Sequence, residues 1–138
     1  MRTLICGGSA FDRLLFDNDQ SALDESALHG LALFTSPRLR CTECHAGFNL
    51  SGPIHHAVGG AAASFHHTGV SESGEAYRAP TLRFLRFTPP HMHDGSQATL
   101  ETVLAFYERG GGPGPSELTP FVLTDAERRD LIAFLNQL

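Results

Sequence analysis

Residues 39–48, "LRCTECHAGF", place Cys41, Cys44 and His45 in a C-x-x-C-H arrangement. Cysteines at this spacing serve three kinds of chemistry: a haem held by two thioether bonds, a metal site, or a redox-active dithiol. A thioether-linked haem needs two thiols three positions apart for its two vinyl groups, and a histidine beside the second thiol for its iron. The motif meets both needs, so the rest of the chain must decide between the haem and its two rivals.

The other two interpretations lack their usual surroundings. Zinc would need a second pair of ligands at a defined spacing from the cysteines. The chain offers three histidine pairs, none at the familiar spacing: His55 and His56, His66 and His67, and His91 and His93. A redox dithiol stands at the start of a helix that follows a strand, whereas a predicted helix precedes Cys41. Haem is therefore the favoured interpretation, and a metal clip remains the alternative.

Length and composition predict one globular domain over residues 1–138. Hydrophobic residues make up 41% of the chain, near the usual globular fraction, and charged residues only 18%. So few charges indicate a surface that is partly hidden against a partner or a cofactor. The net charge of −5 argues against nucleic acid as a partner, since phosphates demand patches of Lys and Arg. No run of 18 apolar residues is present, so we expect no transmembrane segment.

Two helices are predicted before the motif from capping residues and hydrophobic spacing. They cover 9–19 and 21–36, the second with Ser21 as its N-cap. The apolar stripe of the second helix consists of Leu23, Leu28, Leu31, Leu33 and Phe34. Residues 46–80 show little periodicity and are predicted to form a long loop, which a bound group would explain.

Two further helices follow this loop. In the helix over 96–112, one face carries Leu100, Val103, Leu104 and Tyr107. The last helix, over 123–138, has a capping box formed by Thr124 and Glu127. Its buried stripe consists of Leu131, Phe134, Leu135 and Leu138. Since strand signals are weak, the predicted fold class is mainly α with long loops.

Long stretches on both sides of the motif resemble one family. Residues 79–111, "APTLRFLRFTPPHMHDGSQATLETVLAFYERGG", resemble the C-terminal haem domain of the di-haem cytochrome c peroxidase/MauG family. So do residues 9–16 and 23–34, "SAFDRLLF" and "LDESALHGLALF", and residues 123–138 resemble the closing helix of that domain. The resemblance implies a mainly α, cytochrome c-like haem domain that carries one covalently bound haem c.

The family's pattern also implies roles for individual residues. Cys41 and Cys44 would hold the haem, and His45 would be the proximal iron ligand. The family's second axial ligand lies fourteen residues after the histidine of the "HDG" turn, a position that corresponds to Tyr107 when counted from His93. Family members carry methionine or tyrosine there. Methionine raises the reduction potential, whereas tyrosinate favours ferric and higher oxidation states. Tyr107 makes the chain look more like MauG.

Two alternatives to ligation by Tyr107 remain open. From periodicity alone, Tyr107 reads as a core tyrosine whose hydroxyl bonds a backbone carbonyl. Met92 is a rival distal ligand, although a methionine at this position also fills a core well. His91 is expected to be a surface residue, and Cys6 to pack as a small apolar side chain.

The resemblance implies further contacts beyond the iron ligands. Arg83 lies in the family's "PTLR" and is a candidate for pairing with a haem propionate, the alternative being a solvated surface arginine. Thr88 and Pro90 match positions whose backbone carbonyls bind a calcium ion between two haem domains, together with a ligand from the other domain. His66 and His67, in "FHHTGV", are expected to serve loop packing.

The implied function is a low-spin electron-transfer haem that serves a peroxide-reactive haem in an N-terminal domain, or another redox protein. The alternative is a stand-alone mono-haem electron carrier. Haem c is attached outside the bacterial cytoplasm, which implies the periplasm, although the N-terminal apolar run "LIC" is shorter than the core of about 7–15 residues in an export signal. If His45 and Tyr107 fill both axial positions, we expect this chain alone to be a poor peroxidase.

Overall fold

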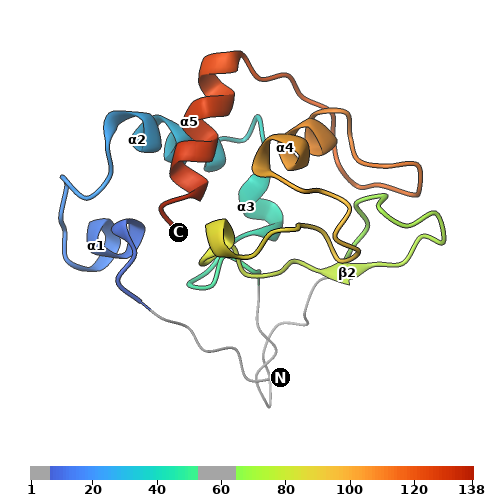
Figure 1. Ribbon diagram of the computed structural model, residues 1–138, viewed down its shortest axis with the longest axis horizontal. Helices are drawn as coiled ribbons and strands as arrows, with labels where there is room; N and C mark the ends of the chain where they lie inside the picture. The colour runs from blue at the N-terminus through green and yellow to red at the C-terminus, as the bar shows by residue number, and fades with distance from the viewer. Residues whose placement is uncertain (1–6, 53–64) are drawn as a thin grey trace.

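The computed structural model describes residues 7–52 and 65–138, and this part of the chain is mainly α-helical, as predicted. In Figure 1 the helix α5 (Asp125–Leu135) runs through the middle of the molecule, with α1 (Ala10–Phe16) and α2 (Glu25–Phe34) on one side and α4 (Leu100–Glu108) on the other. Cys6, His55 and His56 lie outside the described residues.

The first two helices begin at side-chain caps. The Ser9 hydroxyl accepts a hydrogen bond from the Asp12 amide at 3.1 Å, and the Asp12 carboxylate accepts one from the Ser9 amide at 3.2 Å, which forms a capping box for α1. The N-cap of α2 is Asp24, whose carboxylate accepts a hydrogen bond from the Ala27 amide at 2.8 Å. The prediction of Ser21 as this cap was wrong, because its hydroxyl donates to the Asp19 carboxylate at 2.6 Å within the preceding turn.

The two C-terminal helices form within the predicted ranges, although α4 begins four residues later and ends four residues earlier than the predicted 96–112. Thr99 caps α4, and the helix ends before Gly110 and Gly111, whose φ angles of 85° and 103° suit glycine. The capping box predicted for Thr124 and Glu127 is present at the start of α5. All four residues of the predicted stripe on this last segment are buried: Leu131, Phe134, Leu135 and Leu138.

Little regular structure lies between α2 and α4. The single-turn helix α3 (Cys41–Cys44) contains both cysteines of the motif. The described part of the predicted long loop contains two short strands, β1 (Phe65–His66) and β2 (Tyr77–Arg78), which pair antiparallel. The 3-10 turn η1 (Leu85–Phe87) then leads towards α4.

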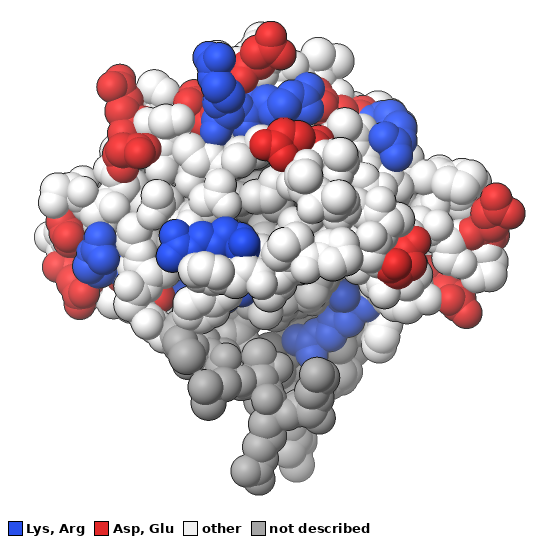
Figure 2. Space-filling model, in the orientation of Figure 1, with Lys and Arg blue, Asp and Glu red and all other residues white. Residues whose placement is uncertain are grey.

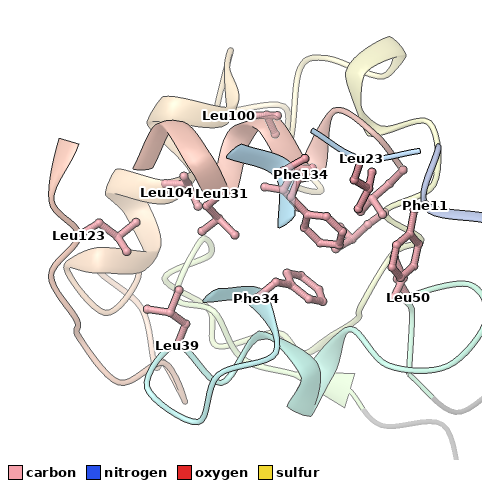
Figure 3. Close-up of a cluster of buried hydrophobic side chains, with 14 residues drawn as sticks. Phe11, Leu23, Phe34, Leu39, Leu50, Leu100, Leu104, Leu123, Leu131 and Phe134 are labelled. Atoms are coloured by element: carbon pink, nitrogen blue, oxygen red, sulfur yellow. The ribbon is translucent and has the colours of Figure 1, made fainter. Parts of the chain in front are cut away.

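The hydrophobic core surrounds α5, and Figure 3 shows Phe134 among its neighbours. The Phe134 ring lies 5.4 Å from the Phe11 ring and 5.4 Å from the Phe34 ring, so α5 joins α1 to α2. Leu39 and Leu50 belong to the same cluster. Since these two leucines flank the C-x-x-C-H motif, the core anchors the motif on both sides.

The face of α2 that packs on α5 differs from the predicted stripe. Leu28 was expected to be buried but is 39% exposed, whereas Ala27 and Gly30 are buried. The reason is a close approach of the two helices, since a β-carbon on Gly30 would lie 2.0 Å from the Asp130 carbonyl oxygen. Small residues therefore form the contact face, which turns Leu28 towards the surface.

Charged side chains are sparse over the molecule. The face in Figure 2 shows arginines interspersed with carboxylates, mostly near the rim, with wide uncharged areas between them. This pattern agrees with the low charged fraction of 18%. Among the described residues, no helix is both long and apolar enough to cross a membrane.

Candidate functional site

The two cysteines of the motif are free, half-buried thiols on α3. Burial raises the pKa of Cys41 to about 11, and burial together with the nearby Glu117 and Glu43 carboxylates raises the pKa of Cys44. Both thiols are therefore protonated at neutral pH. Arg40, in the left-handed conformation with φ of 56°, precedes the helix and binds the Glu43 carboxylate through Nε and Nη2 at 2.7 Å and 2.6 Å.

His45 follows α3 directly, and one of its ring nitrogens is engaged by the backbone. Its Nδ1 atom lies 2.8 Å from the carbonyl oxygen of Leu50. A carbonyl can only accept a hydrogen bond, so Nδ1 carries the proton and Nε2 carries the free lone pair. Burial lowers the pKa of His45, and the carbonyls of Leu50 and Pro80 only partly counter this. The imidazole is thus neutral and has one nitrogen available as a ligand.

The residues after His45 form a tight loop, 46–52, which we call the ligand loop. Two backbone hydrogen bonds close it, from the Leu50 amide to the Gly47 carbonyl at 3.0 Å and from the Gly52 amide to the Ala46 carbonyl at 3.1 Å. The carbonyl oxygens of three successive residues in this loop all accept hydrogen bonds from side chains. The donors are Arg83 Nε to Phe48 at 2.8 Å, Thr81 Oγ1 to Asn49 at 2.7 Å, and His45 Nδ1 to Leu50 at 2.8 Å.

Arg83 is buried against the ligand loop, and only 6% of the residue is exposed. Its Nη1 atom donates to the Asp12 carboxylate at 2.7 Å, and its guanidinium group lies 4.3 Å from the centre of the Phe48 ring. Burial acts to raise the pKa of Asp12, but hydrogen bonds from Arg83 and Ser9 outweigh it and hold this pKa below its ordinary value. The alternative of a solvated surface arginine was therefore wrong.

Tyr107 lies near the end of α4 and close to the cysteines. Burial raises the pKa of Tyr107 to about 12, and the neighbouring Cys44 and Cys41 thiols add to the shift. Within the described part of the chain, no hydrogen-bond partner reaches its hydroxyl, so the alternative of a carbonyl-bonded core tyrosine has no support there. A half-buried phenol beside the two free thiols of Cys41 and Cys44 suits ligation of a group held by those thiols.

His66 and His67 are tied to the loop that follows α4, as their predicted role in loop packing requires. The Nδ1 atom of His66 lies 3.3 Å from the Glu117 carboxylate, and the Glu117 amide donates to the His67 carbonyl at 2.8 Å. Gly112 and Gly114 continue this contact with backbone hydrogen bonds to the carbonyls of Thr68 and Gly69. These bonds brace the segment beyond Tyr107 against β1.

The turn that contains Met92 lies between η1 and α4. It is closed by the His91 amide, which donates to the Gln97 carbonyl at 2.7 Å, and Met92 is half-buried with a φ of 70°. The His93 ring is stacked on the Tyr77 ring with 3.8 Å between their centres. His91 is half-buried rather than fully exposed, since it lines a shallow surface pocket with Pro89 and other residues of η1, α4 and α5.

Thr88 and Pro90, the predicted calcium positions, are both exposed. They lie on either side of Pro89, and the Pro89–Pro90 peptide bond is cis. Within residues 7–52 and 65–138, no three His, Cys, Asp or Glu side chains come together as a metal site would require.

Three residues of this site were missed by the sequence reasoning: Asp12, Phe48 and Thr81. Thr81 lies in the same "PTLR" stretch as Arg83, which was a usable signal. Asp12 gave no such signal, because its position three residues after Ser9 indicates only a helix cap. Its second role arises from a contact across 71 residues of sequence.

Relatives of known name match almost the whole chain. The methylamine utilization protein MauG of Methylorubrum extorquens is 38% identical over an alignment of 146 residues, which covers 99% of this chain and 41% of that protein. The cytochrome c551 peroxidase of Nitrosomonas europaea is 34% identical over 108 residues, covering 72% of this chain and 31% of the peroxidase. No protein-family model matches the chain.

The fold has a solved counterpart. A crystal structure of a MauG-like protein associated with microbial copper homeostasis superposes with a TM-score of 0.80 at 29% sequence identity. The match covers 94% of this chain and 47% of that protein. The chain thus spans less than half the length of these relatives, and the matches cover between 72% and 99% of its own length.

Proposed function

The chain belongs to the family of MauG and the cytochrome c peroxidases, which are c-type haem oxidoreductases, and we propose that it is the electron-transfer haem domain of such a protein. In this proposal one haem c is bound through thioethers to Cys41 and Cys44. His45 Nε2 is the proximal iron ligand, and the Tyr107 oxygen is the distal ligand.

The observation that carries the proposal is the contact between His45 Nδ1 and the Leu50 carbonyl. Histidines that bind metals almost always donate their other ring N–H to a carbonyl or carboxylate, which fixes the tautomer and the ring orientation. With the proton on Nδ1, the lone pair of His45 Nε2 can bind iron. The two free thiols on α3 and the unpartnered phenol of Tyr107 complete a donor set that fits haem c.

When bound, the haem would supply one-electron chemistry at its iron. The residues of the chain would set the conditions for it. Cys41 and Cys44 would fix the ring covalently, and His45 and Tyr107 would exclude water and peroxide from the iron. Arg83 uses Nε and Nη1 within the protein, which leaves Nη2 as the donor for a haem propionate. Met92 is the alternative distal ligand.

The proposal includes a partner. A second haem domain, N-terminal to this one in the full protein, would react with peroxide and exchange electrons with this haem. The length of the relatives, more than twice that of the matched part, supports this arrangement. A calcium ion at the carbonyls of Thr88 and Pro90 would lie between the two domains. Attachment of haem c would take place in the periplasm.

A stand-alone mono-haem electron carrier is the second candidate. It has the same haem ligands and differs only in the absence of a peroxide-reactive partner. The sparse and interspersed charge on the face in Figure 2 favours association through uncharged surface, which both candidates allow. A coding segment directly upstream with a second C-x-x-C-H motif would decide for the two-domain protein.

The proposal is tested by producing the protein in the periplasm with the cytochrome c maturation machinery. We expect covalent low-spin haem in optical and EPR spectra, and a changed EPR spectrum in Tyr107→Phe. Tyr77→Phe is the matched control, because it removes the other tyrosine of the chain and should leave the spectrum unchanged. An unchanged spectrum in Tyr107→Phe would move the distal ligand to Met92, and the absence of covalent haem would refute the proposal.

A further inference from the structure

A short segment after β2 contacts the ligand loop at several points. Thr81 donates from Oγ1 to the Asn49 carbonyl at 2.7 Å, and Arg83 donates from Nε to the Phe48 carbonyl at 2.8 Å. The Thr81 hydroxyl also accepts a hydrogen bond from the Arg83 amide at 3.1 Å, which ties the two donors together. The segment therefore holds two successive peptide groups immediately before the Leu50 carbonyl.

This segment is in turn fixed to the N-terminal helix. The ion pair between Arg83 and Asp12 is buried, with 4% and 7% of the two side chains exposed. The second carboxylate oxygen of Asp12 accepts hydrogen bonds from the amides of Gly8 and Ser9 at 3.0 Å and 3.2 Å. Because the carboxylate is held by the helix terminus, it is a rigid anchor for the guanidinium group.

A chain of contacts thus leads from α1 to the motif histidine. It runs from Asp12 through Arg83 to the Phe48 carbonyl, and two residues later the Leu50 carbonyl accepts the proton of His45 Nδ1. The Phe48 ring, which is 53% exposed, also packs against the Arg83 guanidinium group. A shift of the peptide at Phe48 or Asn49 would move the Leu50 carbonyl with it.

We propose that Asp12, Thr81 and Arg83 are positioning residues that hold the ligand loop, and through the Leu50 carbonyl the imidazole of His45, in one orientation. This inference rests on the proposed function, since it assigns to the loop the task of orienting a haem ligand. It adds to that function a support that begins on α1 and does not touch the iron. Thr81 and Arg83 donate to different carbonyls of the loop, so each of these two side-chain donors can be removed alone.

The test compares haem-loaded variants of the whole chain. Thr81→Val removes only a hydroxyl from a side chain of nearly the same shape, and Arg83→Met keeps the aliphatic stem but removes the donors. Arg13→Met is the matched control for loss of an arginine, because Arg13 is half-exposed and, among the described residues, forms an ion pair only with Asp19, at 3.6 Å. Leu131→Ala controls for loss of stability, since this residue is buried on α5 and makes none of these contacts.

Two readouts separate positioning from general stability. The first is hydrogen exchange of the Leu50 and Gly52 amides, which close the ligand loop. We expect exchange at least about tenfold faster in Thr81→Val and Arg83→Met, with the amides of α5 unaffected. The second is the ferric EPR spectrum, in which we expect additional low-spin species from altered His45 orientations. Arg13→Met should change neither readout. Leu131→Ala should accelerate hydrogen exchange in α5, with no preferential effect on the amides of the ligand loop.

The outcomes distinguish this inference from the proposed function. Haem staining after denaturation reports covalent attachment, and its absence in every protein would refute the proposed function while the exchange data still test the loop contacts. Folded variants with unchanged loop exchange and an unchanged EPR spectrum would overturn the positioning role. If Arg83→Met does not fold, Thr81→Val decides alone. A changed EPR spectrum in Arg83→Met with normal loop exchange would also overturn it, because that result indicates a lost propionate contact instead.

Discussion

Arg83 and Asp12 are 71 residues apart in the sequence, yet the guanidinium Nη1 and the carboxylate Oδ1 lie 2.7 Å apart in a buried ion pair. Removing one partner of such a pair leaves a buried charge without compensation, which is far more costly than losing an exposed pair. The pair therefore joins two distant segments of the fold, and its protonation state should be visible in the stability of the whole chain.

Asp12 should make the haem-loaded protein sensitive to acid. Its pKa in the folded state lies below the ordinary value of 3.8, so the ionised form stabilises the fold. This contribution is fully present above pH 3.8 and is lost as the pH falls through the lower, folded-state pKa. We expect Asp12→Asn to lose about 3 kcal/mol of unfolding free energy at pH 7, with the difference from wild type shrinking below pH 3.8. Urea unfolding at several pH values measures it.

The control for this experiment is Asp17→Asn. Asp17 lies at the C-terminal end of the same helix, is exposed, and belongs to no ion pair among the described residues. Its substitution should change the unfolding free energy by less than about 0.5 kcal/mol at any pH. A difference between wild type and Asp12→Asn that stayed constant from pH 7 to pH 2 would contradict the stabilising role of the ionised carboxylate.

Gly30→Ala should destabilise the contact between α2 and α5. The added β-carbon would lie 2.0 Å from the carbonyl oxygen of Asp130 and 2.7 Å from the β-carbon of Phe134. Because the first of these is a backbone atom, the helices must move apart, and we expect a loss of about 3 kcal/mol or more in unfolding free energy. Gly7→Ala is the control, since its β-carbon would meet nothing closer than 3.9 Å. Equal stabilities of the two variants would contradict the close helix packing.

Local signals were sufficient to predict much of the fold. The capping box of α5 and the burial of Leu131, Phe134, Leu135 and Leu138 depend on residues a few positions apart, and these predictions were confirmed. The N-cap and the buried face of α2 were not predicted correctly. The N-cap depends on which acceptor the Ser21 hydroxyl binds, and the buried face depends on the helix that packs against α2. The Ser21 hydroxyl bonds to Asp19 instead of the helix, and α5 packs on Gly30 instead of Leu28.

The candidate site, too, could be predicted from the sequence only in part. The roles predicted for Cys41, Cys44 and His45 rest on the chemistry of haem attachment, and the role predicted for Tyr107 rests on helical periodicity together with the family resemblance. The contacts of Thr81 and Arg83 with the ligand loop, and of Arg83 with Asp12, could not be predicted, since each spans 32 to 71 residues of sequence. Contacts at such separations depend on the packing of α1 and the loop against one core.

Cys41 should react slowly with iodoacetamide in the folded, haem-free chain. Its pKa of about 11 lies about two units above the ordinary value of 9.0, so the reactive thiolate is about a hundredfold less abundant at pH 8 than in an unfolded chain. Rates are measured by mass spectrometry in a Cys6→Ser background, with and without urea. In the haem-loaded protein neither Cys41 nor Cys44 should react at all. Equal rates for Cys41 in the folded and unfolded chains would contradict its burial.

Tyr107 should limit the stability of the haem-free chain at high pH. Burial raises its pKa to about 12, so the folded state holds the phenol proton more tightly than the unfolded state, whose pKa is 10.0. The stability contributed in this way is complete below pH 10 and is lost as the pH rises towards 12. We expect unfolding on a jump from pH 9 to pH 12, with tyrosinate absorbance appearing together with loss of helical circular dichroism.

Two variants distinguish how much each of the two tyrosines of the chain contributes to this alkaline unfolding. Tyr107→Phe should keep more of its stability at pH 12, because no buried phenol has to ionise, whereas Tyr77→Phe should unfold like the wild type. In the haem-loaded protein a Tyr107 already bound to iron as tyrosinate has no proton to lose, so the alkaline loss of stability should disappear there as well. If the loss persists in the haem-loaded wild type, Tyr107 is protonated in that state, and Met92 becomes the preferred distal ligand.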